Sequence, residues 1–147
     1  MLFTLPEAAS NTPASPGSVL VQGEPEDNVS QKEQSSYRTG VGKLLQMMKW
    51  WRPEILNSVR ELSRFVSGPN EAHVKAMKRV MKYCVATPNR GLFMNPNTVW
   101  DGDPNFERTV NGQSDSDYAK NPDTKKSITG YGTFLNGAPV TQKSRMH

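Results

Sequence analysis

The spacing of apolar residues changes near Gly91, and this change most constrains what the chain can fold into. Between Ser30 and this point, apolar residues recur every three or four positions, the period of an amphipathic helix. After it, they stand in short runs separated by Pro, Asn, Gly and Asp, which is typical of strands joined by turns. We therefore expect the α+β class, with a three-helix segment at residues 30–90 followed by a mainly antiparallel sheet at residues 91–147.

Three helices are expected in the first of these segments. Ser30 and Glu33 have the spacing of a capping box, and apolar residues at helical spacing follow them. Pro53 suits the first turn of a second helix, which we expect to end at "SGPN". Asn70 is a good N-cap for a third helix, which should run to about Ala86.

The third helix separates apolar residues from cations when its positions are placed at about 100° per residue. Its predicted buried side consists of Val74, Met77, Met81, Cys84 and Val85. Its predicted exposed side consists of Lys75, Lys78, Arg79 and Lys82. Two interpretations of these four cations remain open: a solvated helix face, or a contact with the phosphates of a nucleic acid.

Charge is distributed unevenly along the chain. The net charge is −4 for residues 1–37, +8 for residues 38–90 and 0 for residues 91–147. This pattern favours a polyanionic partner that contacts the middle segment. Binding through phosphates would be independent of nucleotide sequence and would weaken steeply as salt rises.

The first residues of the chain show no sustained hydrophobic period. Residues 1–29 are rich in Pro, Ala, Ser, Asn and Glu, so we expect a mostly disordered or extended leader in which "SVLVQ" is a candidate short strand. The opening "MLFTLPEAAS" lacks the basic region of a secretory signal, and no run approaches the roughly 20 apolar residues that span a bilayer. We expect an intracellular protein, cytoplasmic or nuclear, that is not secreted and has no membrane partner.

Two aspartates, Asp115 and Asp117, follow a strand-like run in the second segment. Taken alone, they would most often belong to a polar loop in which their side chains bond nearby backbone amides. On a regular strand they would instead point to the same face. Asp123 lies in "NPDTKK" and is expected to be a turn residue, and "LNGAP" carries the Asn-Gly signal of a tight hairpin.

Two long stretches resemble one known family. "YRTGVGKLLQMMKWWRPEILNSVRELSRFVSGPNEAHVKAMKRVMKYCVATPNRGL" resembles the region after the polymerase palm in copia-type retrotransposon polyproteins. "GQSDSDYAKNPDTKKSITGYGTFLNGAPVTQKS" resembles the opening of the ribonuclease H domain in the same polyproteins. The resemblance implies a thumb- or connection-like segment at residues 30–90. It also implies the N-terminal part of an incomplete ribonuclease H-like domain at residues 91–147.

The resemblance also implies a catalytic and metal-binding role for one carboxylate. Asp115 matches the first metal-binding aspartate of the family, and Asp117 belongs to the same pattern with a less direct role. In the family, hydrolysis of the phosphodiester uses two Mg²⁺ ions about 4 Å apart. Because Mg²⁺ prefers oxygen ligands, carboxylates from separate elements must converge on it.

The function implied by the resemblance is reverse transcription together with cleavage of the RNA strand in RNA·DNA hybrids. The sequence holds neither a Tyr-x-Asp-Asp polymerase motif nor the later ribonuclease H carboxylates. We therefore expect a truncated chain that is inactive alone, binds Mg²⁺ weakly or not at all, and binds an RNA·DNA hybrid or another nucleic acid with low affinity. The alternative is a protein-interaction module whose helices and edge strand near "APVTQ" pair with another polyprotein fragment.

Four further residues are expected to have structural roles. Trp50 and Trp51 could stack on bases, but a Trp pair at a helix end more often packs into a core, which we expect here. His73 is expected to pack or to cap its helix, because no second His or Cys stands at metal-binding spacing. Cys84 lies on the apolar side of its helix and is expected to be a core residue.

Overall fold

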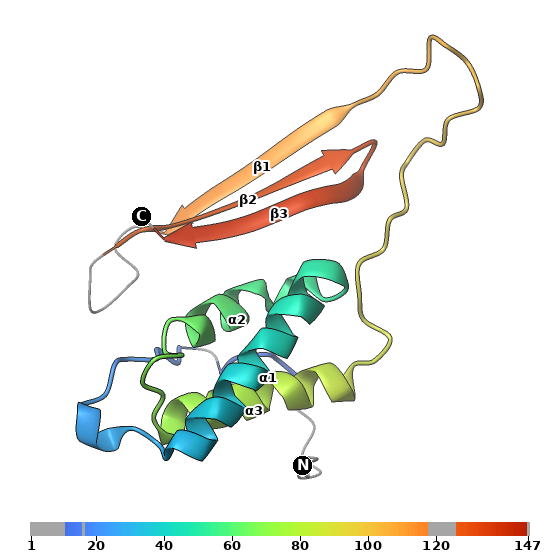
Figure 1. The fold of residues 1–147 in the computed structure, drawn as a ribbon. Helices are drawn as coiled ribbons and strands as arrows, with labels where there is room; N and C mark the ends of the chain where they lie inside the picture. The colour runs from blue at the N-terminus through green and yellow to red at the C-terminus, as the bar shows by residue number, and fades with distance from the viewer. Residues whose placement is uncertain (1–10, 16, 118–125, 147) are drawn as a thin grey trace. The chain divides into compact units, whose positions relative to one another are not determined.

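The computed structural model describes residues 11–15, 17–117 and 126–146. These residues fall into two compact units, one within residues 1–91 and one within residues 92–147, which we call the helical unit and the strand unit (Figure 1). Three α-helices lie in the first unit and a three-stranded antiparallel sheet in the second. The predicted α+β class is therefore confirmed, whereas the ribonuclease H-like assignment remains a prediction. None of the helices among the described residues is long and apolar enough to cross a membrane.

Helix α1 (Gln31–Trp50) begins with the predicted capping box. The Glu33 amide donates to Ser30 Oγ at 3.4 Å, and the Ser30 amide donates to the Glu33 carboxylate at 3.3 Å. Gly40 is buried on this helix, and a Cβ there would lie 2.5 Å from the sulfur of Met77. Gly40 therefore allows helix α3 (Glu71–Ala86) to pack closely against α1.

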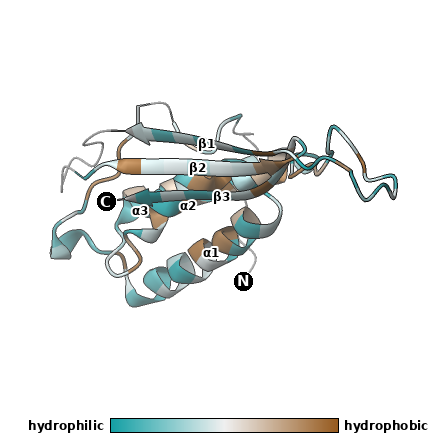
Figure 2. Cartoon of the chain, turned by 90° about the horizontal axis from the view of Figure 1, so that it is seen from above, coloured by the Kyte–Doolittle hydropathy of each residue, from teal (hydrophilic) through white to brown (hydrophobic). Residues whose placement is uncertain are grey.

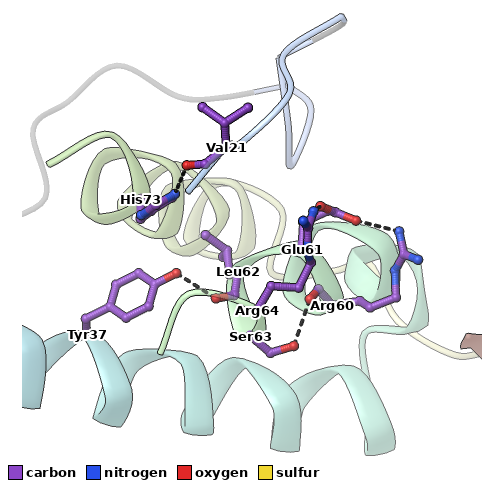
Figure 3. A network of polar contacts seen from close by, with 8 residues as sticks. All are labelled: Val21, Tyr37, Arg60, Glu61, Leu62, Ser63, Arg64 and His73. Atoms are coloured by element: carbon purple, nitrogen blue, oxygen red, sulfur yellow. Dashed lines mark hydrogen bonds and ion pairs between the residues drawn. The ribbon is translucent and has the colours of Figure 1, made fainter. Parts of the chain in front are cut away.

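The second helix is shorter than predicted. The chain enters it through a 3₁₀ turn, η2 (Pro53–Ile55), and helix α2 (Leu56–Ser63) ends before "SGPN". Ile55, Val59 and Leu62 are almost fully buried and pack in one core with residues of α1 and α3. The hydroxyl of Tyr37 donates to the Leu62 carbonyl at 2.8 Å, which ties α1 to the end of α2 (Figure 3).

Helix α3 (Glu71–Ala86) has the predicted limits and the predicted Asn70 cap, but its buried side differs from the prediction. Met77 and Cys84 are buried as expected, whereas Val85 is 66% exposed. The buried residues that the pattern missed are Val80 and Tyr83. The buried positions 73, 77, 80 and 84 follow regular helical spacing, so the predicted side was centred too far toward Val85.

The described part of the leader lies against the helical unit. It contains one 3₁₀ turn, η1 (Pro25–Asp27), and the predicted strand at "SVLVQ" is wrong because no strand forms there. The Val29 amide donates to the Pro69 carbonyl at 2.9 Å, and Leu20 packs against the helical core. This segment is therefore held by hydrogen bonds and by one apolar anchor.

The strand unit contains β1 (Val110–Asp117), β2 (Ile128–Leu135) and β3 (Ala138–Met146), paired in that order. Asn136 and Gly137 join β2 to β3 with φ values of 47° and 84°, which confirms the predicted Asn-Gly hairpin. Along β2, hydrophobic residues stand at the two ends (Figure 2). None of the described residues of this unit is buried.

Candidate nucleic-acid interface

The four predicted cations all lie on α3, but their environments differ. Lys75 and Lys78 are exposed, whereas Arg79 and Lys82 are partly buried. Lys75 Nζ lies 2.9 Å from a carboxylate oxygen of Glu71, one turn earlier on the helix. The hydrogen bond from Lys75 lowers the pKa of Glu71. Such an exposed pair exchanges readily with solvent and leaves Lys75 available to another anion.

Arg79 is engaged with the leader. Its Nη2 donates to Thr12 Oγ1 at 3.1 Å, so part of the predicted cationic ridge is used within the chain. The exposed cationic surface of α3 therefore centres on Lys75 and Lys78, which we call the α3 cation face. This face can contact phosphates as point charges, without reading base edges.

Several other cations of the helical unit have structural roles. Arg52 is 5% exposed, and its guanidinium donates to the Cys84 carbonyl at 3.2 Å and to Thr87 Oγ1 at 2.6 Å. Arg60 and Arg64 each lie 2.7 Å from a different carboxylate oxygen of Glu61 (Figure 3). The net positive charge of the middle segment therefore overstates the charge that the unit presents to a partner.

His73 has the packing and capping role that the sequence predicted. The Asn70 amide donates to Nδ1 at 3.0 Å, and the ring lies 3.9 Å from the Phe65 ring in a stacked arrangement. Because Nδ1 accepts a hydrogen bond, Nε2 carries the proton and donates to the Val21 carbonyl at 3.0 Å (Figure 3). Burial lowers the pKa of His73, although the bond to Val21 acts in the opposite direction. Both nitrogens are therefore used within the chain.

Cys84 is 7% exposed, which confirms the predicted core position. Burial raises the pKa of its thiol, and the nearby Arg52 only partly opposes this effect. The thiol is therefore a small apolar side chain here rather than a reactive group.

The expectation that the Trp pair packs into a core is wrong. Trp50 is 60% exposed and Trp51 is 58% exposed. Trp50 lies on the side of α1 away from the buried residues, and the helix ends there. The next buried side chain along the chain is that of Arg52. At the end of α1, the buried side chain is therefore that of Arg52, and both indoles are exposed to solvent.

The two predicted carboxylate positions both lie on β1. Asp115 is exposed and pairs across the strands with Gly130, which in turn pairs with Ser144 on β3. Asp117 is the last residue of β1 and pairs with Ile128. Asp123 lies outside the described residues.

The donors around Asp115 do not amount to a magnesium site in the part of the chain that the structure describes. No group of three or more His, Cys, Asp or Glu residues there lies close enough to hold a metal ion. One exposed carboxylate is a poor Mg²⁺ site without further oxygen ligands. Asp115 is therefore a possible ligand with no complete site around it among the described residues.

Comparison with known proteins found relatives among transposon polyproteins. The chain is 34% identical over 112 residues to the retrovirus-related Pol polyprotein from transposon RE1 of Arabidopsis thaliana, a match over 76% of the chain and 7% of that polyprotein. It is 30% identical over 110 residues to the corresponding polyprotein from transposon TNT 1-94 of Nicotiana tabacum, a match over 75% of the chain and 8% of that polyprotein. The chain thus spans less than a tenth of the length of these relatives.

A relative of similar size is the secreted RxLR effector protein 161 of Plasmopara viticola. It is 33% identical over 110 residues, which are 74% of the chain and 71% of the effector. No protein-family model matches the chain. No solved structure matches it either.

Proposed function

Since the chain belongs to the family of retrovirus-related Pol polyproteins of copia-type retrotransposons, we propose that its helical unit binds RNA·DNA hybrids through their phosphates. The observation that carries this proposal is the α3 cation face, with Lys75 and Lys78 exposed on one helix. Only one acidic residue, Glu71, lies on the same helix.

The dimensions of α3 suit a contact along a phosphate backbone. Lys75 and Lys82 are seven residues apart, which is about 10 Å along a helix at about 1.5 Å per residue. One strand of a duplex carries a phosphate about every 3.4 Å along its axis. The four cations of α3 therefore extend over roughly three phosphates, with Lys75 and Lys78 the most accessible.

For the strand unit, we propose the opening strands of a ribonuclease H-like domain, with Asp115 as one carboxylate of its Mg²⁺ site in a longer polyprotein. Two features support this assignment. The stretch from Gly112 to Gly137 resembles the start of that domain, and its strands pair as consecutive antiparallel neighbours. Asp115 lies inside β1 and is exposed. The described donors do not complete the site, so we expect no hybrid cleavage by this chain.

The phosphate contact can be tested by fluorescence anisotropy with a labelled RNA·DNA hybrid over a range of salt concentrations. The variant K75Q/K78Q should bind more weakly than the unsubstituted chain. The slope of log affinity against log salt should become shallower by about 1 for each lysine removed. A matched control is K126Q/K143Q, which removes the same charge from exposed positions of the strand unit.

Two results would contradict the phosphate contact. One is an equal loss of affinity in K75Q/K78Q and in K126Q/K143Q, which would mean that only net charge matters. The other is binding that does not weaken as salt rises, because release of counterions from the hybrid requires such weakening.

A second candidate function, pairing with another polypeptide, is favoured by a separate observation. Among the described residues, the outer edges of β1 and β3 have no strand partner, and the sheet buries no side chain. A sheet of this size usually needs cover on one face for stability. Strand addition at an edge would persist at high salt and would protect the amides of β3 from hydrogen exchange, whereas binding to phosphates would do neither.

A further inference from the structure

We propose that the C-terminal end of α1 is a second nucleic-acid contact, at which Trp50 and Trp51 stack on unpaired bases of a single strand. This contact uses residues outside the α3 cation face and reads a different feature of the ligand. A duplex keeps its bases stacked on each other, whereas a single strand offers free base faces.

Exposure is the first observation behind this inference. More than half of each indole-bearing residue is open to solvent, at adjacent positions of the chain. Trp is highly buried on average in folded proteins, and contiguous exposed apolar surface commonly marks an interaction site. Two neighbouring indoles provide the flat surfaces on which bases can stack.

The turn that carries the Trp pair is held in place by the helical unit. The amides of Trp51 and Arg52 both donate to the Met47 carbonyl, at 2.9 Å and 2.8 Å. The buried Arg52 guanidinium then joins this turn to the last turn of α3 through the Cys84 carbonyl and Thr87 Oγ1. The backbone at both indoles is therefore fixed before any ligand binds, which lowers the entropic cost of stacking.

The surroundings of the Trp pair are cationic. Lys49 Nζ lies 5.1 Å from the centre of the Trp50 ring, within the range of a cation–π contact. Arg90 is exposed and donates to the Tyr83 hydroxyl at 3.1 Å, and Arg52 contacts the ring of that same tyrosine.

Two further features concern the backbone and the acidic groups near this turn. The chain after Arg90 passes close to the turn, since a Cβ on Gly91 would lie 3.2 Å from the Trp51 carbonyl oxygen. Glu54, the carboxylate in contact with Arg52, is neutralised by that ion pair.

A surface with exposed aromatic faces next to exposed cations suits a ligand that carries both free bases and phosphates, which is a single-stranded nucleic acid. The bases stack on the indoles, and the phosphates between them lie near Lys49 and Arg90. An acidic peptide would use the cations but would leave most of the indole surface without a flat partner. The charge of this surface thus favours a polyanion, and its flat aromatic area favours one that carries bases.

The test uses the full chain and a labelled oligothymidylate of about 12 nucleotides, a length within the site sizes of single-strand binders. The double variant W50A/W51A should bind this probe at least tenfold more weakly than the unsubstituted chain. The matched control is W100A, because Trp100 is 61% exposed but lies in the strand unit. Circular dichroism melting should be the same for all three proteins, since the substituted side chains are exposed.

A second probe separates stacking from charge. An abasic strand of equal length carries the same phosphates without bases, so it should bind more weakly than oligothymidylate and should not distinguish W50A/W51A from the unsubstituted chain. The variant K75Q/K78Q should bind the hybrid more weakly and keep its affinity for oligothymidylate. Failure of the α3 contact and failure of the Trp contact are therefore distinguishable.

Three results would overturn the inference. The first is unchanged oligothymidylate affinity in W50A/W51A. The second is equal affinity of the unsubstituted chain for the abasic strand and for oligothymidylate. The third is a concentration-dependent dimer in sedimentation that is lost in W50A/W51A while oligothymidylate binding is kept, because the Trp pair would then join two copies of the chain.

Discussion

The helical unit and the strand unit differ in what their side chains bury. The helical unit has a contiguous core drawn from α1, α2 and α3. The two polar side chains that are buried among its described residues, Arg52 and His73, have hydrogen-bond partners. In the strand unit, the described backbone is organised as a regular sheet, but no described side chain is buried.

This difference shows that a chain can form a regular hydrogen-bonded sheet without forming a core of buried side chains. The sheet satisfies its backbone locally, through β1–β2 and β2–β3 pairing. Burial of apolar surface, which is the dominant favourable contribution to folding, is concentrated in the helical unit. The helical unit should therefore determine the measured stability of the chain, and the strand unit should depend on whatever covers its faces.

The largest expected effect comes from a core substitution. Leu44 is 2% exposed, so Leu44→Ala should destabilise the helical unit by about 2–5 kcal/mol, from lost burial and the cavity left behind. Val140 on β3 is 56% exposed, and Val140→Ala should change the free energy of unfolding by less than about 0.5 kcal/mol. Urea unfolding followed by helical circular dichroism measures both. A similar decrease in the free energy of unfolding for the two variants would contradict the proposed difference in stability between the units.

An intermediate effect is expected from acid, through His73. Its pKa is lowered in the folded state, so the unfolded chain binds the additional proton first as pH falls. Stability should therefore be present above about pH 6.5, the ordinary His pKa, and should decline as pH falls from there through the lower pKa of the folded state. One proton of difference gives a slope of at most about 1.4 kcal/mol per pH unit.

His73→Gln provides the control for this prediction. A Gln three residues after an Asn cap can still accept from the cap amide, so the capping box is kept while the titrating ring is removed. Urea unfolding at pH 7 and at pH 5.5 should show a smaller difference for the variant than for the unsubstituted chain. An equal difference would assign the acid sensitivity to another group.

The smallest expected effect is that of Asp115→Asn. The residue is exposed on β1, and the described residues around it hold no group of three metal-binding side chains. Helical unfolding should be unchanged, and cleavage of an end-labelled RNA·DNA hybrid in Mg²⁺ should stay at background for both proteins. Cleavage that disappears in the variant would mean that other carboxylates, from this chain or a second copy, complete a site.

Local signals predicted the helix ends better than the helix faces. Ser30, Glu33 and Asn70 act through hydrogen bonds to amides three residues away, so the sequence alone predicted both caps. The Asn136–Gly137 turn is local in the same sense. The buried side of α3 was predicted off-centre: Val80 lies at helical spacing from Met77 and Cys84 but was not assigned to that side, and Val85, at its margin, was.

In the candidate site, too, some features were predicted from the local sequence and others were not. Spacing placed Lys75, Lys78, Arg79 and Lys82 on one helix, as the structure confirms. It could not show that Arg79 bonds the leader, because Thr12 is far away in the sequence. Exposure of the Trp pair also escaped prediction, since it follows from where α1 ends and from the burial of Arg52 against α3.

The sequence by itself determined the α+β class, the helix caps, the hairpin turn and the family, because these depend on short-range chemistry or on the order of motifs. Only the tertiary structure decided what holds the leader, that Arg79 bonds it, and that the Trp pair faces solvent. These features depend on contacts between residues distant in sequence, where the packing of several elements selects one arrangement among those that each element alone allows.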